Sequence, residues 1–184
     1  RMMNISTLGP DVNESYQKFG VNKKGEIRFG LAAIKGMGEV AAESIIFERE
    51  QNGPYVDLYD FAKRANYSAI NRKAFESLAL SGAFDGFGYS REQYFAVNKK
   101  GEVFLDSLIR FGQVYQASQA EAQHSLFGPT DVNIAYPPVP KADPWQSIER
   151  LNKERELVGI YLSAHPLDDY SPILKTMCNV HPTQ

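Results

Sequence analysis

The sequence predicts a mainly α fold with one small β-hairpin. Apolar residues recur at helical spacing in several stretches after residue 38. Near the start, a turn at residues 22–25 separates two short stretches with strand character, which is typical of a hairpin. With 184 residues, 43% of them hydrophobic and 23% charged, the chain is long enough to bury a core. The same composition excludes a disordered or fibrous protein.

Each predicted element has a local signal at its boundaries. The hairpin strands are residues 16–21 and 26–31, joined by Asn22-Lys23-Lys24-Gly25, whereas residues 1–15 show no periodicity. Capping and helix-breaking residues bound the helices. The predicted helices run from about Gly38 to Asn52, from Asp57 to Ala65, from Ser68 or Asn71 to Ser81, from Ser90 to about Ala122, and from near Trp145 to His165-Pro166.

Between the last two helices the composition changes. Five prolines fall within residues 129–144, which indicates a linker or an extended surface strap. One six-residue string, Val21–Glu26, occurs again as Val97–Glu102. Because the first copy lies in the predicted hairpin and the second lies within a predicted helix, we interpret this repeat as a coincidence.

Charge and cysteine content limit the class of protein. The formal net charge is −2, with a weak basic excess in residues 1–100, so global charge does not predict nucleic-acid binding. Cys178 is the one cysteine and cannot form an internal disulfide, which favours a cytoplasmic location. No apolar run is long enough to span a bilayer, and no signal peptide is recognisable, so we expect no membrane partner.

A helix-hairpin-helix unit is the sharpest local signal. Lys35-Gly36-Met37-Gly38 lies between a short helical stretch and the longer helix that follows. Glycines allow such a turn to approach a phosphate closely, and the second helix directs its free N–H groups and positive dipole end outward. Lys35 adds positive charge. These residues predict contact with a DNA backbone, although an ordinary helical turn has the same pattern.

A second candidate unit follows about 45 residues later. Arg72 and Lys73 lie in a predicted helix that ends at Ser81-Gly82, and another predicted helix begins at Ser90. Tandem units of this kind straddle duplex DNA. The alternative is that Gly82 is only a helix C-cap and Phe84 only a core residue.

The segment before the prolines has the form of a short recognition motif. Gln123-His124-Ser125-Leu126-Phe127 places a polar amide and an adjacent pair of apolar side chains where regular structure is expected to end. Two such anchors can fill a hydrophobic pocket on a partner. The alternative is that Leu126 and Phe127 pack on the core of this domain.

Catalytic and metal-binding groups are missing from the sequence pattern. The carboxylate pairs Asp57/Asp60 and Asp168/Asp169 have no further ligand at a suitable spacing, and the three histidines do not cluster. We therefore predict no catalytic residue, no metal site and no cofactor within these 184 residues.

Four ordered stretches resemble the alpha-subunit family of bacterial DNA polymerase III. They are Gly9–Asn13, Ile27–Gly36, Ser81–Asp85 and Leu157–Leu167, and together they extend over nearly the whole chain. In that family this region follows the palm and fingers and forms a tandem helix-hairpin-helix domain. The resemblance implies four parts: the end of the fingers at 1–30, the DNA-binding domain at 31–122, a clamp-binding motif and linker at 123–144, and a C-terminal helix at 145–184.

The resemblance also implies a function. The family's sliding-clamp motif matches Gln123, Ser125, Leu126 and Phe127, which become the expected clamp anchors. Lys35, Gly36, Met37, Gly38, Arg72, Lys73, Ser81 and Gly82 become the expected contacts to duplex DNA. The parent protein would be a Mg²⁺-dependent DNA-directed DNA polymerase that meets other replicase subunits, and its catalytic carboxylates would lie upstream of Arg1.

Two rival functions remain. Base-excision glycosylases also use a helix-hairpin-helix unit, followed by a glycine- and proline-rich segment with a catalytic aspartate. Residues 52–57 imitate that pattern loosely and end in Asp57. The other rival is an interaction domain that makes no contact with DNA.

Overall fold

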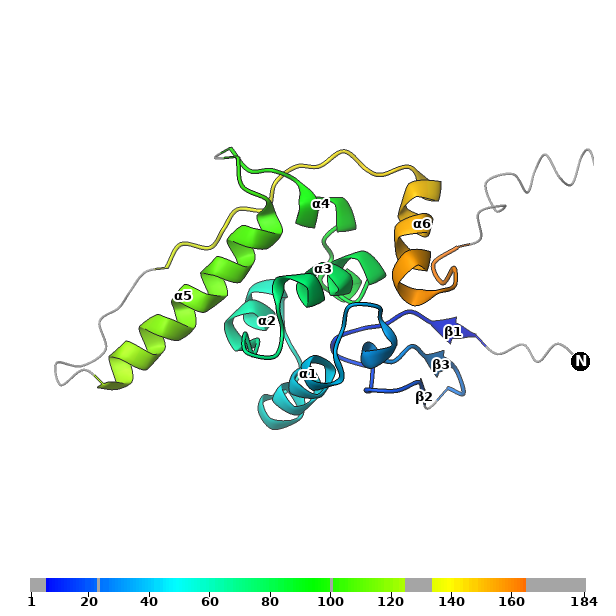
Figure 1. Cartoon of the computed structure of the whole chain (residues 1–184), viewed down its shortest axis with the longest axis horizontal. Helices are drawn as coiled ribbons and strands as arrows, with labels where there is room; N and C mark the ends of the chain where they lie inside the picture. Colours follow the sequence, from blue (N-terminus) through cyan, green and yellow to red (C-terminus); the bar gives the residue numbers. More distant parts are fainter. Residues whose placement is uncertain (1–5, 23, 100, 125–133, 165–184) are drawn as a thin grey trace, which may run out of the picture.

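The structure is a computed structural model that describes residues 6–22, 24–99, 101–124 and 134–164. It is mainly helical with a small sheet, as the sequence predicts. The helices are α1 (Glu39–Asn52), α2 (Leu58–Arg64), α3 (Arg72–Ser81), α4 (Arg91–Phe95), α5 (Phe104–His124) and α6 (Ser147–Val158), with short 3-10 turns η1 (Leu31–Ala33) and η2 (Asp85–Phe87). Figure 1 shows α3 in the middle, with α2 and α5 on one side of it and α6 on the other.

The sheet contains the predicted hairpin and one further strand. Strands β2 (Gly20–Val21) and β3 (Ile27–Arg28) pair antiparallel, and β1 (Thr7–Leu8) pairs with β3 in parallel, in the order β1-β3-β2. Strand β1 has no sequence signal, because a strand of two residues has no measurable periodicity. Its backbone is held by a partner about twenty residues away in the chain.

The core is a stack of aromatic rings around α3. Phe61, Phe75 and Phe84 are fully buried, and the Phe61 ring meets the other two edge to face at centroid distances of 5.6 and 5.0 Å. Such edge-to-face pairs stabilise the fold by more than the burial of their apolar area alone would. The helix caps follow the sequence: Asp57 accepts from the Asp60 N–H, and Asn71, rather than Ser68, accepts from the Ala74 N–H.

The predicted single helix from Ser90 to about Ala122 is wrong. The chain forms α4, leaves the helical conformation, and begins α5 at Phe104, with an isolated antiparallel bridge between Val97 and Val103. The eight residues between the two helices, 96–103, include the second copy of the repeated string. A turn therefore stands where we expected continuous helix.

The repeat is not a coincidence at the level of conformation. The glycine of each copy has a left-handed φ, +80° at Gly25 and +81° at Gly101. In each copy the glycine N–H donates to the asparagine carbonyl at 3.0 Å. The Asn22 and Asn98 side chains accept from the N–H groups of Glu26 and Glu102, at 3.0 and 3.1 Å. The asparagine, glycine and glutamate of each copy thus close the same turn twice.

The proline-rich segment is an extended strap, as predicted, over its described residues 134–146. It crosses the body from the side of α5 to α6 (Figure 1). The Tyr59 hydroxyl donates to the Pro137 carbonyl at 2.7 Å, and the Trp145 ring stacks on Phe95 with centroids 5.7 Å apart. The last helix is shorter than expected because Gly159 ends it in a left-handed conformation.

Candidate nucleic-acid interface

The first predicted hairpin joins η1 to α1 through Lys35-Gly36-Met37-Gly38. Gly36 has a φ of +88°, and a Cβ atom built on it would lie 2.7 Å from the Ser77 hydroxyl oxygen. Both the left-handed conformation and the close approach of α3 therefore require glycine at position 36. Lys35, Gly36 and Gly38 are exposed, so the turn is open to a ligand.

Hydrogen bonds to helices α3 and α6 fix the position of this hairpin. The Ser77 hydroxyl on α3 donates to the Lys35 carbonyl at 2.9 Å, and the Lys35 N–H donates to the Leu157 carbonyl on α6 at 2.9 Å. The side chain of Lys73 also lies against the turn, with its Cε atom 3.5 Å from the Cβ position of Gly36. The fold thus brings Lys73 from α3 to Lys35 and Gly36, although the sequence separates them by more than thirty residues.

Met37 does not have the role that the sequence predicted for it. Its side chain is only 6% exposed and belongs to the hydrophobic core, and its N–H donates to the Ile34 carbonyl at 3.0 Å. An apolar side chain in this position anchors the turn instead of meeting a phosphate. Met37 is therefore a structural residue.

The N-terminus of α1 lies directly after the turn. Gly38 is its N-cap, and no side chain caps the first turn of the helix. The first-turn N–H groups and the positive end of the helix dipole make this end favourable for an anion. Glu39 at the first helical position is exposed and carries the opposite charge, which offsets part of that potential.

The second predicted unit is not an exposed hairpin. Ser81 is 2% exposed and its hydroxyl donates to the Leu78 carbonyl at 3.2 Å. Gly82 is a buried left-handed C-cap of α3, and Phe84 is 1% exposed in the core. Ser81 and Gly82 are therefore corrected from phosphate contacts to structural residues, because both are buried and the Arg91 guanidinium lies directly against Gly82.

Arg72 and Lys73 differ in how much of their charge is available. The Arg72 guanidinium pairs with Asp106 at 2.6 Å and with Glu76 at 3.0 Å, and its hydrogen bond to Asp106 is the main cause of a raised pKa. Two carboxylates thus neutralise Arg72 locally. Lys73 is exposed beside the hairpin, so it is the better partner for a phosphate.

Sequence reasoning missed a buried ionic network that docks α6. Glu154 is 1% exposed, and its carboxylate accepts from Arg91 at 2.8 Å. It also accepts from the N–H groups of Leu162 and Ser163, at 2.7 and 2.8 Å. A signal existed in the sequence: Glu154 lies between Leu151 and Val158 on the apolar face of α6, where an acidic residue needs a partner.

The acidic, histidine and cysteine candidates named from the sequence do not form a metal-binding cluster within the described residues. The described residues contain no group of three or more histidine, cysteine, aspartate or glutamate side chains that could hold a metal ion. The Asp57 carboxylate, the glycosylase-like candidate, is engaged as the N-cap of α2 at 2.7 Å from the Asp60 N–H. Cys178, Asp168 and Asp169 lie outside the described residues.

The clamp-motif residues fall at the end of α5 and beyond it. Gln123 belongs to α5, whereas Ser125, Leu126 and Phe127 lie outside the described residues.

Across the part of the chain that the structure describes, no helix combines the length and apolar character needed to cross a membrane.

Comparisons with known proteins agree with the hairpin. A family model described as a helix-hairpin-helix motif matches residues 4–94. The chain is 37% identical over 187 residues to the DNA polymerase III subunit alpha of Pasteurella multocida, covering 99% of the chain and 15% of the relative. It is 34% identical to that of Vibrio cholerae (91% and 14%) and 38% identical to that of Deinococcus radiodurans (92% and 12%). The chain therefore spans about one seventh of the length of these relatives.

Proposed function

Because the chain is homologous over nearly its whole length to one segment of bacterial DNA polymerase III alpha subunits, we propose that it binds the backbone of duplex DNA. The observation that carries the proposal is the exposed turn Lys35–Gly38, with Lys73 packed beside it and the uncapped N-terminus of α1 behind it. Glycines, helix N–H groups and two ammonium groups together suit a phosphate.

Binding of this kind does not depend on base sequence. The groups at the hairpin can reach phosphates and offer no side chain suited to reading base edges. Because two lysines neutralise about two phosphates, we expect modest affinity and a slope of about −2 for the logarithm of the binding constant against the logarithm of salt concentration.

Substitution of the two lysines tests this proposal. We expect Lys35→Ala and Lys73→Ala each to weaken duplex binding by the same factor on unrelated sequences, and each to reduce the salt slope by about one. Lys141→Ala is the control, since Lys141 is exposed on the strap and lies beside Ser90 and Gln93, which are not part of the hairpin. Fluorescence anisotropy over a range of salt concentrations measures both quantities.

Unchanged binding in both hairpin variants, or an equal loss in Lys141→Ala, would remove the hairpin from the interface. Binding that does not respond to ionic strength in any form would favour the interaction domain without DNA contact.

We also propose that the motif at the end of α5 docks a sliding clamp, through Gln123, Ser125, Leu126 and Phe127. The support is the match of these residues to the family motif and their place next to a helix end. A clamp that encircles DNA keeps the polymerase at high effective concentration, so modest affinity at each site suffices. Loss of clamp binding in Leu126→Ala/Phe127→Ala, with Val114→Ala unchanged, is the expected result in calorimetry.

The longer protein would be a DNA-directed DNA polymerase whose Mg²⁺-binding carboxylates and further replicase contacts lie outside this chain. This assignment of roles is supported by the length of the relatives, because most of each relative lies outside the region that matches this chain. In this scheme, residues 1–184 hold DNA and the clamp and carry out no chemistry.

A further inference from the structure

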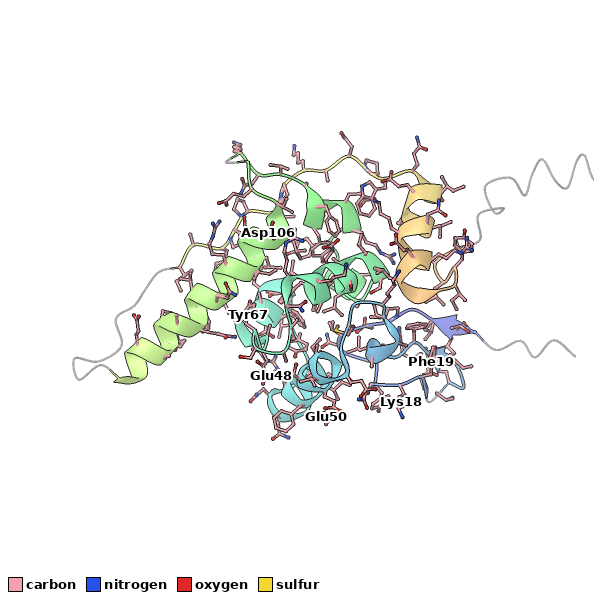
Figure 2. The ribbon with its side chains drawn as sticks, viewed as in Figure 1. Lys18, Phe19, Glu48, Glu50, Tyr67 and Asp106 are labelled. Atoms are coloured by element: carbon pink, nitrogen blue, oxygen red, sulfur yellow. The ribbon has the colours of Figure 1, made fainter. Side chains whose placement is uncertain are left out.

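A groove runs between α1 and the segment before β2, on the side of α1 that faces away from the core. Its cavity of about 530 Å³ is lined by Lys18, Phe19, Glu43, Phe47 and Glu50, among others. Figure 2 shows Lys18 and Phe19 on the strand side and Glu50 on α1, in the lower part of the molecule. None of these residues has a role in the DNA-binding proposal.

Large apolar side chains are exposed in this groove. Phe19 is 56% exposed and Phe47 is 65% exposed, and they come from opposite walls. The Phe19 ring meets the buried Phe29 edge to face, with centroids 4.6 Å apart, so the core fixes its position while much of its surface stays open. Two aromatic side chains exposed across one groove indicate a surface that a partner covers.

The walls of the groove are already formed. Arg49 on α1 is 9% exposed, and its guanidinium donates to the carbonyls of Val12 and Ser15, at 2.7 and 2.5 Å. The Gln17 side chain donates to the Glu43 carboxylate at 2.9 Å. These bonds tie the segment before β2 to α1, so a partner would bind a preorganised site.

The charge of the groove argues against a nucleic acid. Along α1, Val40, Glu43, Phe47 and Glu50 are exposed and recur at helical spacing on one face, so apolar and acidic side chains alternate there. Among the described residues that line the groove, Lys18 is the one cation opposite these carboxylates. Phosphates would be repelled by this wall, whereas an apolar polypeptide segment with basic side chains would fit it.

The groove is also separate from the DNA-binding hairpin. Phe47 lies nine residues after Gly38, which corresponds to about 13 Å along the axis of α1. One helix therefore carries two surfaces: its N-terminus for DNA and its outer face for another partner.

We propose that a segment of the longer polymerase chain, outside residues 1–184, packs into this groove. It would place apolar side chains between Phe19 and Phe47 and a basic side chain toward Glu43 and Glu50. The matched relatives carry about six sevenths of their length outside this region, so most of the polypeptide available to cover the groove lies there. The inference rests on the proposal that the chain works as part of such a polymerase, and it is independent of DNA binding.

Site-specific photo-crosslinking in the full-length polymerase tests the inference without DNA. A benzophenone amino acid replaces Phe47 in one variant and Phe19 in another, and Val56 in the control, because Val56 is 84% exposed and does not line the groove. We expect the first two variants to form intrachain crosslinks to peptides outside residues 1–184, identified by mass spectrometry, and the control to form none to the same peptides.

Crosslinks from Phe47 and Phe19 only to residues within 1–184, only to another protein, or to nothing would overturn the inference. Because the readout contains no DNA, a failure of DNA binding by the hairpin would leave a positive crosslinking result intact. Conversely, absence of crosslinks would leave the hairpin proposal standing.

Discussion

Gly82 and Gly88 have nearly the same backbone conformation but different surroundings. Their φ and ψ angles are 86° and 11°, and 79° and 12°, so both lie in the left-handed region. A Cβ atom at Gly82 would collide with the Arg91 guanidinium and lie 2.7 Å from the Asp85 carboxylate, whereas a Cβ atom at Gly88 would meet nothing within 4 Å. Comparing substitutions at the two glycines therefore separates the cost of the left-handed backbone from the cost of a side-chain collision.

We expect Gly88→Ala to lower the free energy of unfolding by about 1 to 2 kcal/mol, the usual cost of an L-residue in this conformation. Gly82→Ala should cost roughly 3 kcal/mol more, because it also displaces Arg91 from its buried partner. Urea unfolding of both variants measures the difference. Equal losses would mean that Arg91 moves aside freely.

Glu39 opposes the anion-binding end of α1, so its charge should limit DNA affinity. We expect Glu39→Gln to strengthen duplex binding about two- to fivefold at low salt, since a charge at a helix N-terminus is worth about 0.3 to 1 kcal/mol. Glu156→Gln on the exposed face of α6 is the matched control. Anisotropy that shows the same gain for both variants would indicate a general effect of net charge.

At the scale of elements, the docking of α6 depends on one buried carboxylate. Burial alone would raise the pKa of Glu154. Hydrogen bonds from the Ser163 hydroxyl, the Arg91 guanidinium and two backbone N–H groups outweigh burial and hold that pKa below the ordinary glutamate value. The charged form is therefore favoured by folding.

A lowered pKa of Glu154 makes the docking of α6 sensitive to acid. Its contribution to stability is complete above the unfolded-state pKa, and it is lost as pH falls through the lower pKa of the folded state. We expect acid titration, followed by near-ultraviolet circular dichroism, to show a loss of stability below about pH 4.5 that is smaller in Glu154→Gln. An identical acid profile in Glu154→Gln would contradict this role; at neutral pH the variant should already be less stable.

The elements that local sequence specifies were predictable, and the others were not. Asp57 and Asn71 carry cap signals, and the structure confirms α2 and α3 at those residues. The start of α5 was missed because helix-forming residues lie on both sides of Val97–Glu102 and conceal the turn between them. Strand β1 forms only by pairing with β3, about twenty residues away in the chain, and no local sequence pattern predicts that pairing.

At the scale of the whole molecule, long-range packing decided which candidate site residues stay available. Lys35, Gly36 and Gly38 could be chosen from the sequence because a hairpin is local. The place of Lys73 beside Gly36, and the burial of Ser81 and Gly82, result from the packing of α3 and α6. Tertiary contacts of this kind leave no trace in the spacing of residues.

The same packing couples α6 to the hairpin through the bond between the Lys35 N–H and the Leu157 carbonyl. We expect Leu151→Ala, which removes a side chain 1% exposed, to lower stability by about 2 to 5 kcal/mol. It should also speed hydrogen exchange of the Lys35 amide and weaken duplex binding. Ile148→Ala, at a position 47% exposed on α6, should change neither. Fast exchange in both variants would contradict the coupling.

The duplicated turn also bears on the order in which the chain folds. Its asparagine and glycine bonds close within six residues in two different surroundings, so local interactions suffice to form it. Short local structures of this kind form in microseconds, well before contacts between distant segments. Both copies should therefore be in place early. One brings β2 to β3 and the other sets where α5 starts, so the collapsing chain acquires two fixed bends before its core assembles.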